Sequence, residues 1–182
     1  MTAPAAEAAS AGRWQAGGVA GALGVAAAAG LAPVGAWPVT LIALAMWVRQ
    51  VGAAHGAGRA AWLGWAFGAG YFAAGLSWIV EPFLVDAARH GWMAPFALAA
   101  ISGGAALFWA GAAALAVRLA GADRARRAGA LLAALTLAEV VRGRALSGFP
   151  WNEIGQLWIG TPAMQLAAWG GPHLLSVLAL AP

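Results

Sequence analysis

The sequence contains no cysteine and no lysine, and charged residues make up only 9% of its 182 positions. The absence of cysteine excludes disulfide bonds, thiolate metal sites and a cysteine nucleophile. The absence of lysine excludes a phosphate-binding loop of the Walker type. Soluble domains carry roughly 25% charged residues, so a soluble fold of this length could not cover its surface with so few charges.

Apolar residues dominate the composition. Hydrophobic side chains account for 63% of the chain before its 26 glycines are counted, whereas soluble domains reach about 45–50% with glycine included. The apolar residues form runs that are each near the roughly 20 residues needed to cross a bilayer core. The sequence therefore predicts an all-α integral membrane protein, a polytopic helical bundle of about six spans, of which the first two form a short hairpin.

The expected organisation is a cytoplasmic N-terminal tail, residues 1–13, followed by a transmembrane helical domain, residues 14–182. A cleaved signal peptide is the alternative for the first run, because Ala27–Gly30 offers small residues to a peptidase. No basic residue or polar tail follows the last run at Pro182, and we therefore expect the chain to be part of a longer protein. The expected spans are 17–31, 39–48, 60–80, 92–117, 128–146 and 163–181.

The arginines predict an orientation, because cytoplasmic loops of membrane proteins carry the excess of basic residues. With the N-terminus inside, seven of the ten basic residues are cytoplasmic, and only Arg89, Arg142 and Arg144 lie outside. The net charge of +4 does not indicate a nucleic-acid partner. The arginines lie at the ends of apolar runs, whereas nucleic-acid binders gather basic residues on one face.

Eleven tryptophans are present. Most of them lie near the ends of the expected spans, where amphipathic rings favour the headgroup region of a bilayer. We therefore expect an aromatic belt. Its members would be Trp37, Trp47, Trp62, Trp78, Trp92, Trp151 and Trp158.

The third run carries Gly64, Gly68 and Gly75, which fall within roughly 40° of one another around a helix. Gly64 and Gly68 form a G-x-x-x-G pair, a spacing that allows a second helix to approach closely. We expect these three glycines to serve helix packing. The alternative is that they line a groove for a lipid chain.

The fifth run carries Glu139, and Arg142 follows three residues later. A carboxylate inside a span is costly and is usually paired, and the spacing lets Arg142 supply the partner. We expect a structural ion pair between Glu139 and Arg142. The alternative is that Arg142 and Arg144 face the outer leaflet and hold a lipid phosphate, which arginine matches with two parallel hydrogen bonds.

Two further groups carry weaker signals. Glu81, Asp86 and His90 share one loop, but without a second histidine they are not expected to bind a metal. His173 and Ser176 are not expected to form a base and a nucleophile, because no acid is placed to orient the histidine and no G-x-S-x-G turn surrounds the serine. No catalytic residue, metal or cofactor is expected in this chain.

The stretch A-E-V-V-R-G, Ala138–Gly143, followed by S-G-F-P-W-N-E-I-G, Ser147–Gly155, resembles the membrane domain of apolipoprotein N-acyltransferase. Upstream, G-W-A-F-G-A-G-Y-F-A-A-G-L-S-W-I, Gly64–Ile79, is similar to the Gly-rich span of the same family. The resemblance implies a bacterial inner-membrane enzyme that moves an acyl chain from a phospholipid to the N-terminal cysteine amine of a diacylated lipoprotein. It also implies a Glu-Lys-Cys catalytic set on a periplasmic nitrilase-like domain. Because this chain has neither lysine nor cysteine, no catalytic residue carries over, and the chain alone is expected to be inactive.

By this resemblance the chain would serve lipid access and anchoring, with Arg142, Arg144, Phe149 and Trp151 as lipid contacts. Its partners would be the phospholipid acyl donor, the diacylated lipoprotein acceptor and the membrane. Two alternatives stay open. One is a small non-enzymatic membrane protein complete at this length, either a transporter or a lipid-binding subunit; the other is an inactive homologue.

Overall fold

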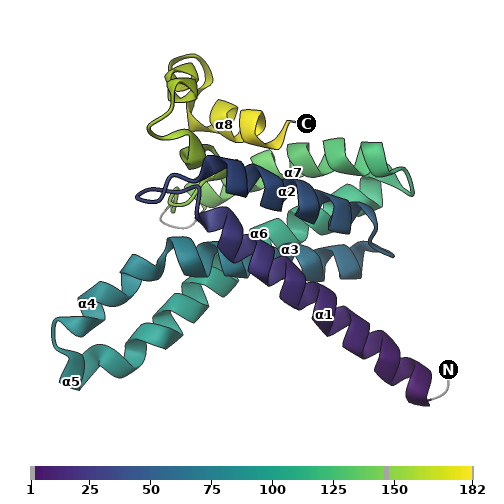
Figure 1. Cartoon of the computed structure of the whole chain (residues 1–182), viewed down its shortest axis with the longest axis horizontal. Helices are drawn as coiled ribbons and strands as arrows, with labels where there is room; N and C mark the ends of the chain where they lie inside the picture. Colours follow the sequence, from purple (N-terminus) through teal and green to yellow (C-terminus); the bar gives the residue numbers. More distant parts are fainter. Residues whose placement is uncertain (1–2, 146–147, 182) are drawn as a thin grey trace.

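The computed structural model describes residues 3–145 and 148–181. Over these two ranges every regular element is a helix and no strand occurs, as the sequence predicts. In Figure 1, α3 and α6 form a long pair through the centre of the molecule, and α1 crosses α3. Helix α7 packs on α6 and α2, and α8 lies against the end of α7.

The helices differ in their bounds from the expected spans. The first begins at Ala3, so that most of the expected tail is helical. Short elements fill the two long connections: η1 (Ser77–Val80), α4 (Glu81–Leu84), α5 (Ala87–His90) and η2 (Gly91–Met93) before α6, and η3 (Ile154–Trp158) and η4 (Pro162–Leu166) before α8. The longer helices are α1 (Ala3–Ala28), α2 (Trp37–Gly52), α3 (Ala57–Gly75), α6 (Ala94–Ala120), α7 (Arg124–Arg144) and α8 (Ala167–Leu180).

One helical stretch of the described residues, the 34-residue Ala87–Ala120, is long and apolar enough to cross a bilayer. Ala57–Gly75 and Ser77–Leu84 would qualify together, but the two are bent by 61°. The continuous third span expected over residues 60–80 is therefore wrong. Helix α3 ends at Gly75, a residue type that destabilises a helix by roughly 1 kcal/mol relative to alanine.

The continuous span expected over residues 163–181 is also wrong. Helix α8 is interrupted at Gly170 and Gly171, whose backbone dihedrals are not helical, and Gly171 has a φ of 67°. Pro172 follows and fits the first turn of the second helical piece, where no backbone N–H is needed. Each piece is shorter than the roughly 20 residues of a full span.

Aromatic side chains form the centre of the core. The Trp109 ring lies 5.7 Å from Phe67, 5.1 Å from Tyr71 and 5.1 Å from Phe72, measured between ring centroids. Trp47 stacks on Phe67 at 4.5 Å and is fully buried. The expectation that Trp47 belongs to an interfacial belt is therefore wrong. Its indole N–H donates to the Leu63 carbonyl instead, at 3.1 Å.

Two glycines of α3 lie directly against α6. A Cβ atom added at Gly64 would come within 2.6 Å of the Trp109 carbonyl oxygen. One added at Gly68 would come within 3.1 Å of the Ala106 Cα. The two backbones thus approach more closely than larger side chains would allow.

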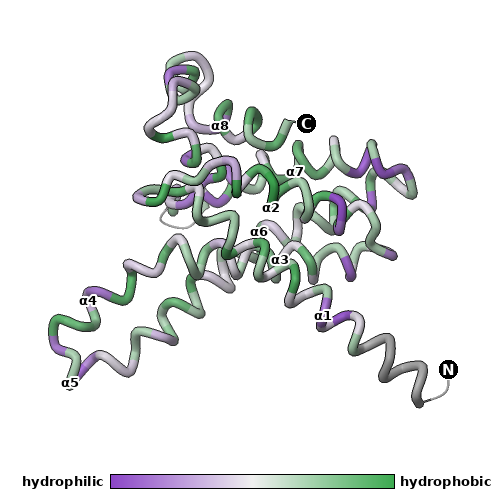
Figure 2. Tube along the Cα trace, in the orientation of Figure 1, coloured by the Kyte–Doolittle hydropathy of each residue, from purple (hydrophilic) through white to green (hydrophobic). Residues whose placement is uncertain are grey.

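Several hydrophilic segments lie at the ends of helices. Figure 2 shows them at the α6–α7 turn and at the end of α2, on one side of the molecule, and at the α4–α5 tip on the other. Arg127 ties the first of these regions together, because its guanidinium donates to the carbonyls of Gly52 and Ala54 at 2.9 and 3.0 Å. The start of α7 is thereby fixed beside the end of α2.

Candidate functional site

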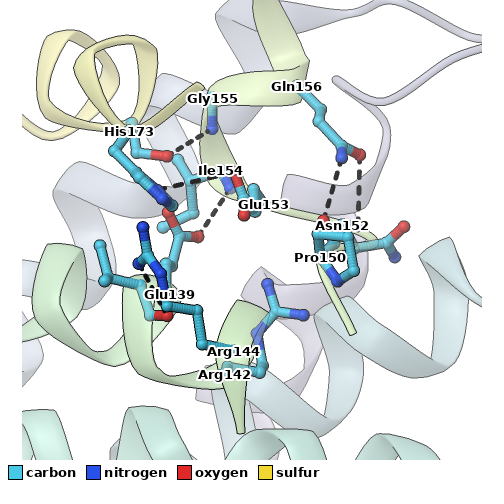
Figure 3. A network of polar contacts seen from close by, with 12 residues as sticks. Glu139, Arg142, Arg144, Pro150, Asn152, Glu153, Ile154, Gly155, Gln156 and His173 are labelled. Carbon is cyan, nitrogen blue, oxygen red and sulfur yellow. Dashed lines mark hydrogen bonds and ion pairs between the residues drawn. The ribbon is translucent and has the colours of Figure 1, made fainter. Parts of the chain in front are cut away.

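Five buried polar or charged side chains gather where the end of α7, the segment 148–156 and α8 meet (Figure 3). Such side chains are rarely buried unless they are paired or have a function. They come from three elements that are far apart in the sequence. We call this set the polar corner: Glu139, Arg142, Asn152, Glu153 and Ser176.

Arg142 holds the first half of the segment against α7. Its Nη1 donates to the backbone carbonyls of Phe149 and Trp151 at 2.7 and 2.8 Å. The guanidinium carbon lies 5.0 Å from the centre of the Phe72 ring, within the distance of a cation–π contact. Arg142 is only 3% exposed. The alternative in which Arg142 faces the outer leaflet and holds a lipid phosphate would require an accessible guanidinium.

Glu139 and Ser176 hold the second half of the segment. The Ile154 N–H donates to Glu139 Oε1 at 2.7 Å, and the Gly155 N–H donates to Ser176 Oγ at 3.0 Å. Both acceptor side chains are fully buried. One comes from α7 and the other from α8, so the segment is pinned between the two helices.

The ion pair expected between Glu139 and Arg142 is not among the ion pairs of residues 3–145 and 148–181, which join Arg126 to Asp123 and His173 to Glu153. Both side chains use the loop backbone instead. The loop supplies two carbonyls to the cation and an N–H to the carboxylate. Backbone groups that would otherwise be buried without partners are thereby satisfied.

Glycines give the segment the room that this arrangement needs. A Cβ at Gly155 would lie within 2.7 Å of the Pro172 carbonyl and 2.8 Å of the Ser176 nitrogen. At Gly75 a Cβ would collide with the side-chain amide of Asn152. Gly75 therefore faces the loop, whereas Gly64 and Gly68 face a helix. Asn152 itself has a φ of 57°, a conformation that asparagine tolerates better than most residues.

Glu153 lies close to His173 across the corner. The Glu153 Oε2 and His173 Nδ1 atoms are 3.8 Å apart, and the carboxylate is almost fully buried. The sequence analysis found no acid placed to orient His173; the fold brings Glu153 close to it, but neither of the two atoms has a hydrogen-bond partner among the described residues. Burial raises the pKa of the Glu153 carboxyl above its usual value, while the nearby His173, Arg142 and Arg144 act in the opposite direction.

Several polar atoms of the corner have no hydrogen-bond partner among the described residues. They are Glu139 Oε2, Arg142 Nε and Nη2, Asn152 Nδ2 and Glu153 Oε2. The Tyr71 hydroxyl and His173 Nδ1, which belong to neighbouring residues, have no partner either. Unpaired buried groups each cost roughly 1–3 kcal/mol. A corner that retains so much unused donor and acceptor capacity could accommodate water or a polar group between α3 and α7.

The outer surface of the segment is aromatic. Trp151 is 53% exposed, and its ring meets that of Trp78 edge to face at a centroid distance of 5.7 Å. Phe149 is half-buried and packs against the core, and Arg144 is exposed. Of the four residues predicted to contact lipid, Arg144 and Trp151 are thus accessible, Phe149 partly so, and Arg142 is not.

The remaining candidates lie apart from the corner. Asp86 caps the short helix α5 by accepting from the Arg89 N–H at 3.3 Å. Within residues 3–145 and 148–181, no three His, Cys, Asp or Glu side chains form a group that could hold a metal ion. Ser176 is fully buried and accepts a bond from Gly155, so it is not available as a nucleophile.

The sequence did not single out Asn152 and Glu153 as functional residues. A signal was present, since a carboxylate and an amide stand next to each other in a stretch otherwise made of Gly, Pro, aromatic and aliphatic residues. The residues that they meet, Gly75 of α3 and His173 of α8, could not be identified without the fold.

Residues 23–181 match the family model of the apolipoprotein N-acyltransferase N-terminal domain. The apolipoprotein N-acyltransferase of Caulobacter vibrioides is 47% identical over 121 residues, which cover 66% of this chain and 23% of that protein. The one of Rhodopseudomonas palustris is 43% identical, covering 68% and 24%. The one of Bradyrhizobium diazoefficiens is 38% identical over 174 residues, covering 90% of this chain and 32% of that protein. The matched part of the chain thus spans 23–32% of the length of these relatives.

Proposed function

Because the chain belongs to the family of the apolipoprotein N-acyltransferase N-terminal domain, we propose that it forms the membrane-embedded part of such an enzyme. The whole enzyme would transfer an acyl chain from a phospholipid to the N-terminal cysteine amine of a diacylated lipoprotein, in the bacterial inner membrane. Both substrates are lipids, so the membrane part must collect them laterally from the bilayer.

A bilayer location is supported by the apolar side chains that the helices expose. Val19 and Val25 of α1, Ile42 of α2, Leu107 of α6 and Leu137 of α7 are all at least half exposed. Large apolar side chains are thus exposed on four of the longer helices, an arrangement that suits helices surrounded by lipid. We propose about six crossings, some of them bent or short, with the N-terminus in the cytoplasm because the arginines favour that side.

We propose that the catalytic group of the enzyme lies outside this chain. Acyl transfer through a thioester needs a cysteine thiolate, and the sequence contains none. The purified chain, mixed with phospholipid and diacylated lipopeptide, should give no triacylated product by mass spectrometry. Turnover above that of a heat-treated sample would contradict the proposal that the catalytic group lies outside this chain.

The role we assign to the polar corner is to hold the segment 148–156 as one wall of the lipid entrance. The observation that carries this proposal is the contrast within the segment. Its backbone is bound on the inner side by Arg142, Glu139 and Ser176, yet Trp151 remains half exposed. An aromatic ring on a fixed backbone can contact an acyl chain without first being ordered, which lowers the entropy cost of binding.

Arg144 is the residue that we propose to meet the lipid phosphate. It is exposed, and its only hydrogen bond within the described residues is a 3.4 Å contact to the Val140 carbonyl. Its guanidinium is therefore free to form two parallel hydrogen bonds with a phosphate. Arg142 acts behind it by fixing the loop.

The test is Trp151→Ala in the full-length enzyme, reconstituted in phospholipid vesicles with a diacylated lipopeptide. If the ring is part of the entrance, turnover per folded molecule falls while the midpoint of unfolding stays close to that of the wild type. If it only anchors the loop at the interface, the unfolding midpoint falls and turnover per folded molecule is unchanged.

A matched control is Trp92→Ala. Trp92 is also exposed, at 68%, and also has an aromatic neighbour, since its ring lies 6.2 Å from that of Phe96. It lies outside the polar corner, on η2. Turnover that falls equally in the two variants would argue against a specific role for the segment 148–156.

A further inference from the structure

A second feature of the molecule is an apolar groove between α2, α7 and α8. It has a volume of about 680 Å³, within the range of roughly 300–1,000 Å³ that is typical of small-molecule sites. Its walls are made of leucine, alanine, valine and glycine together with Trp158, and among the described residues Arg49 is its only charged lining residue. The representative wall residues are Leu41, Leu44, Val48, Leu132, Leu135 and Leu178.

The Arg49 end of the groove is strongly basic. Arg49 lies in the last turn of α2, and α7 begins beside it with Arg124, Arg126 and Arg127. Arg127 is bound to the α2–α3 turn, and Arg126 lies 3.9 Å from Asp123. No hydrogen bond or ion pair of the Arg49 side chain is found in the described part of the chain, and the side chain is exposed.

We propose that this groove binds one acyl chain of an anionic phospholipid, with the lipid phosphate paired to Arg49. The apolar walls would accept the chain of any lipid, whereas the basic end selects a negatively charged headgroup. From Leu41 to Arg49 the groove follows eight residues of helix, about 12 Å, so that part of a chain lies along it while the phosphate reaches the arginine. The site lies at the opposite end of α7 from the polar corner and goes beyond the proposed acyl transfer, on which it does not depend.

The groove has open space in which the proposal can be tested. A Cβ added at Gly129, one of its lining residues, would meet no atom within 4 Å. Gly129→Leu would therefore begin its side chain in open space and fill part of the groove. Leucine also has a higher helix propensity than glycine, so the variant should fold.

The experiment is native mass spectrometry of the purified chain in detergent micelles, titrated with phosphatidylglycerol or phosphatidylethanolamine of identical acyl chains. We expect phosphatidylglycerol to be retained preferentially. Arg49→Gln should weaken its retention about five-fold, the ratio that corresponds to about 1 kcal/mol per arginine near an anionic lipid. Gly129→Leu should lower the retention of both lipids, and Arg118→Gln, which removes another exposed arginine outside the groove, should leave retention unchanged.

Three results would overturn the proposal. Equal retention of the two lipids, or no effect of Arg49→Gln, would mean that the groove only touches bulk lipid. Displacement of phosphatidylglycerol by glycerol 3-phosphate alone would mean that a free phosphate is recognised without an acyl chain. A dimer that dissociates in Gly129→Leu would mean that a second copy of the chain occupies the groove.

Discussion

Replacing Arg142 with methionine removes the side chain that fixes the first half of the segment 148–156. Two hydrogen bonds from its guanidinium, to the carbonyls of Phe149 and Trp151, would be lost. Hydrogen bonds to charged groups contribute about 1.5–3 kcal/mol each, so the gross loss is roughly 3–6 kcal/mol. Methionine keeps an unbranched apolar stem of similar length, so that little packing volume is removed.

Part of this loss is offset. The Nε and Nη2 atoms of Arg142 have no partner within the described residues, and methionine removes the cost of burying them. Against this, the buried carboxylate of Glu139 would lose a nearby positive charge. We therefore expect the free energy of unfolding to fall by about 3 kcal/mol, at the lower end of the gross loss from the two hydrogen bonds.

Two measurements check this prediction. Reversible unfolding in mixed micelles, followed by tryptophan fluorescence and titrated with a denaturing detergent, gives the global loss. Limited trypsin digestion gives the local one, because the exposed Arg144 precedes the segment and its peptide bond should be cut faster once the segment is released. Arg89→Met is the matched control, since Arg89 is exposed and outside the polar corner; it should change stability by less than about 0.5 kcal/mol.

The reasoning is refuted if Arg142→Met is no less stable than Arg89→Met and is cut after Arg144 at the wild-type rate. In that case the two short hydrogen bonds would contribute nothing to the position of the segment. A global loss without faster cutting would also count against the local role, because it would mean that Arg142 stabilises the bundle rather than the loop.

Three further predictions follow from the described residues. Single cysteines at Ala122 and Ile159, both exposed, should be labelled by an impermeant thiol reagent in intact spheroplasts only at Ile159; labelling only at Ala122 would reverse the proposed orientation. Gly155→Ala should cost about 1–3 kcal/mol because of the contacts that its Cβ would make, whereas Gly111→Ala, whose Cβ meets nothing within 4 Å, should be neutral or slightly stabilising in the same unfolding assay. Burial raises the pKa of Glu153 in the folded chain, so its contribution to stability is present at acidic pH and is lost as the pH rises through the folded-state pKa; Glu153→Gln should flatten this dependence, and an unchanged pH profile would contradict it.

Local patterns were sufficient for the helical class of the chain and for its family. The apolar runs predicted helices, and the described residues contain only helices. The ordered motifs around Gly64, Ala138 and Ser147 indicated the family that the matched region 23–181 establishes. These properties depend on residue type and on spacing along the chain, which a sequence carries directly.

The breaks in the helices were only partly readable. Gly75 and the pair Gly170 and Gly171 are visible as weak points for a helix, but glycine is also common inside membrane helices. Whether the chain bends there depends on what it meets on the far side. At Gly75 that is Asn152, which stands 77 positions later in the chain.

The partners of the buried charges were decided by tertiary structure alone. Helical spacing puts Glu139 and Arg142 on one face, and this made a direct ion pair the natural prediction. The folded segment 148–156 brings backbone carbonyls and an N–H to that same face, and buried backbone groups must find partners. The spacing along one helix can only predict contacts within that helix. The sequence therefore pointed to Glu139 and Arg142 but not to the buried Glu153, and the position of the loop determined what Glu139 and Arg142 bind.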